Sequence, residues 1–89
     1  MHEESLKSYS QKDLSRLLEN GVHIPDLGLV SITRDVKLEN IFPGCTIYPF
    51  VRITGSRTQI QSGASIGARG PVVLENSFIG KNAVIGDLG

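Results

Sequence analysis

The stretch from Ile47 to Gly86 carries an aliphatic residue at every sixth or seventh position. The members of this series are Ile47, Ile53, Ile60, Ile66, Val73, Ile79 and Ile85. A second small or aliphatic residue precedes most of them by two positions, and Gly, Pro, Asn, Lys and Arg fill the slots between. Each unit therefore predicts a short strand with two inward positions, followed by a turn of two or three residues.

A unit of this size has one row of inward apolar side chains and no core of its own, so it must stack on neighbouring units to bury them. A fixed short period with Gly after the aliphatic residue, as at Ile66-Gly67 and Ile79-Gly80, indicates a parallel β-helix. The seven-residue spacings are interpreted as one-residue bulges at corners, one of them at Arg69-Gly70-Pro71. A small antiparallel sandwich or barrel is the alternative, but hairpins would not keep the six-residue phase through repeated turns. We therefore expect an all-β solenoid of about three and a half coils, with three sides in each coil.

Residues 1–20 have a different pattern, which predicts an N-terminal linker or capping helix. Ser10 to Asp13 resembles a capping box, and Asn20-Gly21 is a typical stop signal. Between them, leucines follow at helical spacing: Leu14, Leu17 and Leu18. We expect this leucine stripe to cover the open end of the first coil. The predicted organisation is a capping helix in residues 1–20 and a partial β-helix in residues 21–89.

Composition and charge limit which partners the chain could bind and in which cell compartment it could be found. Nine basic residues balance nine acidic ones, so no overall field attracts nucleic acid or an anionic membrane. No apolar run approaches the roughly 20 residues that span a bilayer, and the start of the chain lacks the features of a signal peptide. We therefore expect a cytoplasmic protein. The single cysteine, Cys45, falls on the inward stripe, which predicts a buried small side chain and not a reactive thiol.

Several pieces of the chain resemble one family of enzymes. Residues 11–26, with the Gly21-Val22, Ile24 and Asp26 entry, are followed by Ile47-Tyr48-Pro49 and by Leu74-Glu75-Asn76-Ser77 with Ile79-Gly80. Together they resemble the linker helix and first coils of bacterial bifunctional UDP-N-acetylglucosamine pyrophosphorylase / glucosamine-1-phosphate acetyltransferase. Two positions depart from the family pattern, since Leu27 stands where Pro is usual and Phe50 where Gly is usual. The resemblance implies a left-handed parallel β-helix, a homotrimer and, for the full family enzyme, acetyl-CoA and Mg²⁺.

The chemistry of that family has no counterpart among the residues of this chain. The family's acetyltransferase site uses His, Lys and Arg from later coils, and its nucleotide-binding domain precedes the linker helix. Here we expect His2 in an N-terminal tail and His23 to face outward, and two histidines cannot build a three-histidine zinc site. We expect no catalytic, cofactor-binding or metal-binding residue, and a sugar-phosphate substrate only if the natural chain continues beyond Gly89.

Two weaker candidates for anion binding remain. The stretch from Gly67 to Gly70 is rich in glycine but lacks the strand-to-helix context of a phosphate loop. Arg52 and Arg57 are placed where a corner could bind phosphate or a nucleotide, although solvated corner residues are the favoured interpretation.

Two functional hypotheses follow. In the first, the chain is the hexapeptide-repeat portion of a sugar-nucleotide acyltransferase of the UDP-N-acetylglucosamine type, and it serves in scaffold and trimer formation. In the second, it is a stand-alone, non-catalytic assembly module. The mass of the natural gene product separates the two, because only the first expects a longer protein.

The outer surface of the late coils predicts the interface of the homotrimer. Outward neighbours of the inward stripe are polar in the early coils, as at Ser31 and Thr33, and become large and apolar near the end. The predicted interface residues are Val72, Leu74, Phe78 and Val84. The residues expected to point inward are Ile60, Ala64, Ile66, Val73, Ile79 and Ala83. In the alternative register, a corner bulge shifts the strand and buries Val72 instead.

Overall fold

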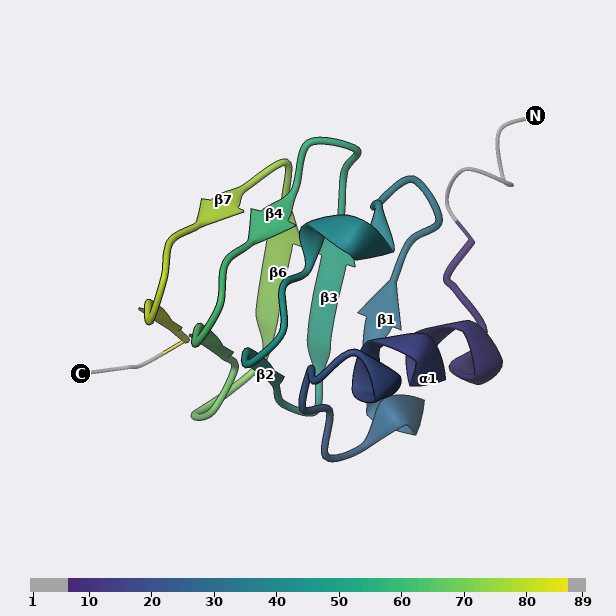
Figure 1. Cartoon of the computed structure of the whole chain (residues 1–89), viewed down its shortest axis with the longest axis horizontal. Coiled ribbons are helices and arrows are strands. Elements are labelled where there is room, and N and C mark those ends of the chain that lie inside the picture. Colours follow the sequence, from purple (N-terminus) through teal and green to yellow (C-terminus); the bar gives the residue numbers. More distant parts are fainter. Residues whose placement is uncertain (1–6, 87–89) are drawn as a thin grey trace.

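The computed structural model describes residues 7–86 and shows one α-helix, two short 3-10 helices and eight short strands (Figure 1). In chain order the elements are α1 (Gln11–Glu19), η2 (Leu27–Leu29), β1 (Ser31–Ile32), η3 (Leu38–Asn40), β2 (Thr46–Ile47), β3 (Val51–Thr54), β4 (Gln59–Ile60), β5 (Ser65–Ile66), β6 (Val72–Glu75), β7 (Phe78–Ile79) and β8 (Val84–Ile85).

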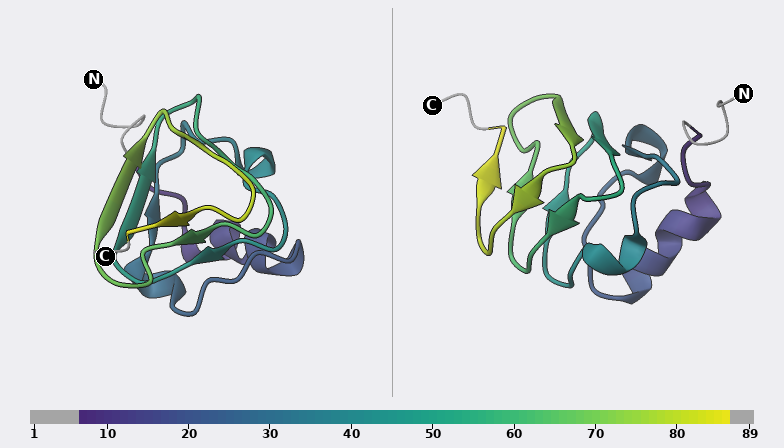
Figure 2. Two further views of the ribbon diagram at one scale, coloured as in Figure 1. Left: turned by 90° about the vertical axis from the view of Figure 1, so that its left-hand side faces the viewer. Right: turned by 90° about the horizontal axis from the view of Figure 1, so that it is seen from above.

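The strands form three small parallel sheets on three sides of one core. The orders are β1-β3-β6, β2-β5-β8 and β4-β7. Paired residues lie 21 positions apart in the first sheet, as in Ile53 with Leu74, and 19 apart in the other two, as in Ile47 with Ile66. Viewed end-on, the backbone has a three-sided outline, with β6, β7 and β8 at the C-terminal end (Figure 2).

The predicted fold class, an all-β solenoid formed by a left-handed parallel β-helix, is corrected by this structure. The described chain is a small compact body, with a Cα radius of gyration of 11.9 Å, in which each separate sheet has only two or three strands. Most strands are two residues long, because in most turns Gly, Pro or Asn soon interrupts the extended backbone. Helix α1 also contributes to the core, so the body is not all-β.

Helix α1 closes the end of the core next to β1 (Figure 1). Ser10 caps the helix, since its hydroxyl accepts a hydrogen bond from the Asp13 N–H at 3.2 Å. Leu14 and Leu17 are each 1% exposed and join the core, whereas Leu18 is 41% exposed. The helix prediction is therefore confirmed over Gln11–Glu19. The rest of the predicted 1–20 segment includes residues 1–6, which lie outside the described range.

The core is built mainly from isoleucines and valines that alternate with outward residues along the strands. Fully buried members include Ile32, Ile47, Ile53, Ile60 and Ile66. Of the residues expected inward, Ile60, Ala64, Ile66 and Ile79 are buried and Ala83 is half-buried. Cys45 is also buried, as predicted, and its thiol donates a hydrogen bond to the Phe42 carbonyl at 3.1 Å.

Val73 is the exception, because it is 70% exposed and points outward. Leu74, paired with Ile53, takes the inward position. The spacing of inward residues is thus eight from Ile66 to Leu74 and five from there to Ile79, where the prediction assumed seven and six. The turn at Gly67–Pro71 is longer than expected, and Asn76, with φ of 47°, permits a tighter turn before β7.

Candidate functional site

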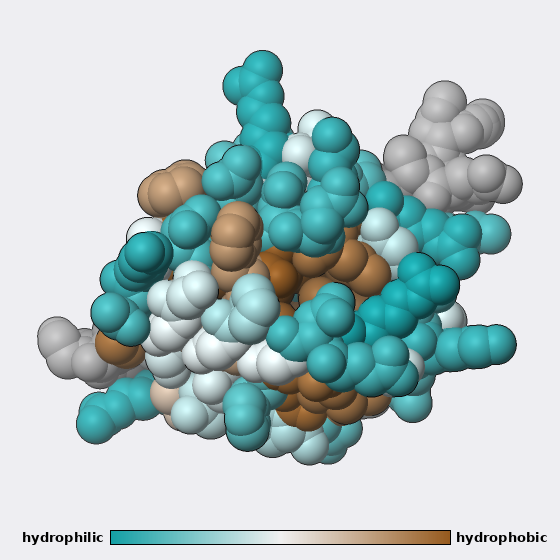
Figure 3. All heavy atoms as spheres, viewed as in Figure 1, coloured by the Kyte–Doolittle hydropathy of each residue, from teal (hydrophilic) through white to brown (hydrophobic). Residues whose placement is uncertain are grey.

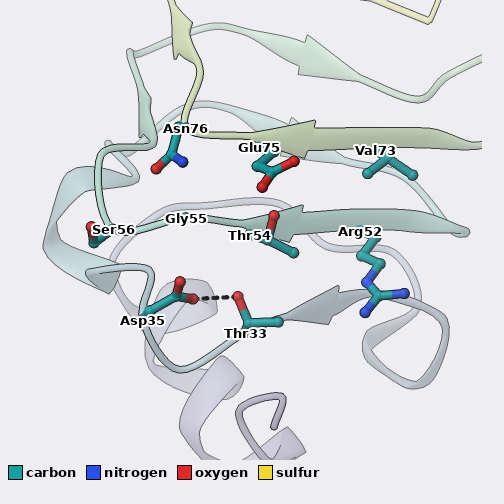
Figure 4. Close-up of a pocket in the computed structure, with 9 residues that line it drawn as sticks. All are labelled: Thr33, Asp35, Arg52, Thr54, Gly55, Ser56, Val73, Glu75 and Asn76. Atoms are coloured by element: carbon teal, nitrogen blue, oxygen red, sulfur yellow. Dashed lines mark hydrogen bonds between the residues drawn. The ribbon is translucent and has the colours of Figure 1, made fainter. Parts of the chain in front are cut away.

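A polar groove lies on the outer face of the β1-β3-β6 sheet and has a volume of about 440 Å³ (Figure 4). Side chains of β3, of β6 and of the segment that follows β1 form its floor. The lining residues are Thr33, Asp35, Arg52, Thr54, Gly55, Ser56, Val73, Glu75 and Asn76. The parallel register brings them together, since Arg52 pairs with Val73 and Thr54 pairs with Glu75.

The charges in the groove are one guanidinium and two carboxylates. Asp35 accepts a hydrogen bond from the Thr33 hydroxyl, whose residue is 2% exposed (Figure 4). In the described part of the chain, no ion pair joins Arg52 to Asp35 or Glu75. The groove can therefore offer hydrogen-bond acceptors and one cationic donor to a ligand. It lacks a His or Cys, and its Ser56 has no neighbouring base within hydrogen-bond contact, so a nucleophilic reaction is not supported.

The residues considered for anion binding are scattered. Arg52 lines the groove, but Arg57 lies on an exposed turn where its backbone N–H donates to the Asn76 side chain at 3.2 Å. Gly67–Gly70 forms a turn in which the Gly70 N–H reaches the Gly67 carbonyl at 3.4 Å. A strand, β6, follows this turn, so the geometry of a phosphate loop is absent from it.

Of the two histidines, His23 is the one that lies within the described residues. His23 is exposed, and its backbone forms a parallel bridge with Thr46 beside a hollow of about 220 Å³. His2 lies outside the described residues. Within residues 7–86, no three side chains of the His, Cys, Asp and Glu types are placed to hold a metal ion.

The four predicted interface residues divide into two groups. Leu74 is 6% exposed and Val72 is half-buried, so the expectation that they point outward is wrong. Phe78 and Val84 do point outward and are 66% and 60% exposed. Val73, which the sequence placed in the core, joins them on the surface. Figure 3 shows one face of the molecule, where hydrophilic side chains predominate and hydrophobic ones gather in a central hollow and along the lower side.

Each of the three exposed residues lies on the last strand of a different sheet. Val73 belongs to β6, Phe78 to β7 and Val84 to β8, whereas the residues paired with them on the preceding strands are Arg52, Gln59 and Ser65. The sequence alone shows that the outward residues change from polar in the early strands to apolar in the last ones.

The groove cannot be found from the sequence alone, because it depends on the 21-residue register that places Thr33, Thr54 and Glu75 side by side.

Burial also determines the chemistry of the single thiol. Loss of solvation raises the pKa of Cys45 from 9.0 to about 11, and a backbone hydrogen bond opposes this rise in part. The thiolate is the reactive form of cysteine, so this side chain is unsuited to nucleophilic catalysis near neutral pH.

The helices of residues 7–86 include none with the length and apolar character needed to cross a membrane. Comparisons of the chain with protein-family models, with curated proteins and with solved structures found no match.

Proposed function

We propose that this chain is the scaffold portion of a cytoplasmic sugar-nucleotide acyltransferase of the UDP-N-acetylglucosamine type, and that it self-associates as a homotrimer without catalytic residues of its own. The enzyme class rests on the resemblance of Gly21–Asp26 and Ile47–Pro49 to that family. The observation that carries self-association is the exposure of Phe78 and Val84 on two neighbouring faces of a small body. Association with other copies would remove both apolar side chains from water.

The placement of these two residues favours a rotational assembly. Phe78 lies on the β4-β7 face and Val84 on the β2-β5-β8 face, and the turn between β7 and β8 joins the two. An isologous interface built on one face would leave the other face exposed, whereas a ring in which unlike faces meet buries both in every copy. Three is the number of copies that the resemblance implies.

Burial of these side chains supplies a moderate driving force. Removing a Phe or Val side chain from water contributes about 1.5–3 kcal/mol, before the entropic cost of association is subtracted. A carboxylate in either position would oppose association, because it would be desolvated without a partner.

Sedimentation of Phe78→Glu and Val84→Glu variants tests the proposed homotrimer. Each variant is expected to sediment as smaller species than the unaltered chain at micromolar concentration. Leu29→Glu is the matched control, since Leu29 is 43% exposed and lies on η2, which is not one of the strands of either sheet. A trimer that survives both substitutions would exclude this interface.

An activity assay tests the non-catalytic role. The purified 89-residue chain is expected to show no turnover of glucosamine-1-phosphate with acetyl-CoA. Measurable turnover would contradict the proposal. If the natural gene product has the mass of this chain alone, the second hypothesis of a stand-alone assembly module takes its place.

A further inference from the structure

The polar groove lies on the side of the body that the proposed homotrimer leaves free. Phe78 and Val84 belong to the β4-β7 and β2-β5-β8 sheets, whereas the groove belongs to the β1-β3-β6 sheet. Its strand residues point away from the face of that sheet and not along its edges, so a further strand beside β6 would extend the face without covering them. The volume of about 440 Å³ falls in the range of small-molecule sites.

The register of the sheet arranges the floor of the groove in rows. The Thr33 N–H donates to the Ile53 carbonyl at 3.0 Å, so the residue after β1 keeps the register of β1 with β3. Thr54 pairs with Glu75, and the outward side chains of Thr33, Thr54 and Glu75 therefore form one row across the face. Arg52 lies two residues before Thr54 on β3, which separates their Cα atoms by about 6–7 Å.

The row that includes Thr54 carries the negative charge of the groove. The Asp35 carboxylate is held at one side of it, because the hydroxyl of the buried Thr33 donates a hydrogen bond to Oδ1. Glu75 stands at the other side, with Thr54 between the two acidic residues (Figure 4). The Thr54 hydroxyl donates to the Leu74 carbonyl at 3.2 Å. Two carboxylates therefore flank a position above Thr54 that holds no positive charge.

The opposite end of the groove carries the positive charge. Figure 4 shows Arg52 at this end, away from Asp35. The residues paired with Arg52 on the neighbouring strands, Ser31 and Val73, are uncharged. Within residues 7–86, no ion pair joins the guanidinium to either carboxylate. Three charged groups thus face one groove, with their signs separated along the strand direction.

We propose that the groove binds a linear zwitterion whose ammonium and carboxylate groups lie about 6–7 Å apart, as in an ω-amino acid or a dipeptide. The ligand carboxylate accepts hydrogen bonds from the Arg52 guanidinium, which can donate two in parallel. The ligand ammonium lies above Thr54 and donates to Asp35 and Glu75, since an ammonium has three donors. Val73, which is 70% exposed beside Arg52, contacts the carbon chain that joins the two groups.

The charges of the groove favour this class of ligand over simpler ones. A ligand with only a carboxylate would meet two like charges at the acidic end, and a diamine would meet the guanidinium at the other end. The charges of an α-amino acid are about 2.5 Å apart, too close to reach both ends. An extended dipeptide spans about 6–7 Å. A zwitterion of that length gives each of its charges an opposite partner.

Binding of 5-aminopentanoate, followed through the NMR signals of the 89-residue chain, tests the proposal. The groups of the groove are exposed, so each ion pair contributes little and the dissociation constant is expected to be on the order of 1–10 mM. Backbone amide signals of Thr33, Thr54 and Glu75 should shift and saturate. Glycine, pentylamine and pentanoate, at matched ionic strength, are the control ligands, because each lacks either the spacing or one of the charges. Each should bind at least about threefold more weakly.

Substitutions at the two ends should change the preference for ligands in opposite ways. Arg52→Gln is expected to raise the dissociation constant of 5-aminopentanoate about three- to fivefold and not to weaken the binding of pentylamine. Asp35→Asn should weaken the binding of both. Arg57→Gln is the matched control, since Arg57 is also exposed but does not line the groove, and it should leave both constants unchanged. A general loss of structure would not produce this pattern.

Three results would overturn the proposed site. One is the absence of saturable shifts with 5-aminopentanoate up to about 50 mM, several times the expected dissociation constant. Another is equal binding of 5-aminopentanoate and pentylamine by the unaltered chain, which would make the groove a site for cations alone. The third is an equal effect of Arg52→Gln and Arg57→Gln on the binding of 5-aminopentanoate. None of these measurements depends on the homotrimer, because the groove lies on a different face from Phe78 and Val84.

Discussion

Gly55 lies directly beneath Asn76, so closely that a Cβ atom on the glycine would come within 2.6 Å of the asparagine backbone nitrogen. Both residues have positive φ angles, 101° and 47°, and they occupy equivalent turns after β3 and β6. The Asn76 side chain accepts a hydrogen bond from the Arg57 N–H, so one turn is held by the next. This contact fixes the tight turn that moves Leu74 into the core.

Gly55→Ala is expected to lower the free energy of unfolding by about 2 kcal/mol or more, because the left-handed conformation and the contact with Asn76 both oppose a side chain. Gly70→Ala is the matched control, since nothing lies within 4 Å of a Cβ at that position. Its effect should stay within about 0.5 kcal/mol. Urea unfolding measures both, and equal effects would contradict the stacked-turn geometry.

Ile66→Ala should lower the free energy of unfolding by roughly 2–5 kcal/mol, as large-to-small substitutions in a core do. Val73→Ala should cost about 0.5 kcal/mol or less, because Val73 is 70% exposed. Large losses in both variants would restore the register that the sequence pattern predicted, because that register also places Val73 in the core. Denaturant melts of the two variants at equal concentration decide between them.

Two adjacent leucines test the attachment of α1. Leu17→Ala is expected to destabilise the fold by about 2–5 kcal/mol, since Leu17 is 1% exposed in the core. Leu18→Ala has nearly the same helix propensity change but removes a side chain that is 41% exposed, so it should cost about 1 kcal/mol or less. Similar losses would indicate that the helix does not dock through Leu17.

The raised pKa of Cys45 makes stability depend on alkaline pH. The folded state holds the thiol neutral up to about 11, whereas the unfolded chain releases its proton near 9.0. The unfolded state therefore binds fewer protons between these values, and the contribution of Cys45, complete below about 9, is lost as the pH rises to about 11. Cys45→Ala removes this component, so the stability difference between the two proteins should change across that window and stay constant from about pH 6 to 8. A constant difference throughout would show that the thiol is accessible to water.

The sequence predicted best those features that depend on neighbouring residues. The capping Ser10, the leucine spacing and the Asn20-Gly21 stop are local signals, and α1 follows them. The burial of Ile60, Ile66 and Cys45 likewise follows from a strict local period. The fold class was not predicted correctly, because a repeat period alone determines neither strand length nor the number of strands in each sheet.

The register after Gly67 depended on information that the local pattern lacks. Two adjacent valines, Val72 and Val73, fit the inward slot equally well by hydropathy. The pairing of β6 with β3 decides between them, because it places Val72 beside the buried Val51 and Val73 beside the exposed Arg52, each 21 positions earlier. The groove depends on the same separation, since Thr33 and Glu75 reach it from opposite edges of one sheet.

The constant separation of 19 or 21 residues between paired strands has a consequence for how the chain folds during synthesis. Each pairing closes a loop of nearly the same length, so the entropic cost of closure is similar at every step. No described strand pairs with a segment from the far end of the sequence. In a nascent chain, β1 can therefore pair with β3 before β6 has left the ribosome. Strand β3 (Val51–Thr54) then offers its free edge for pairing with β6 (Val72–Glu75).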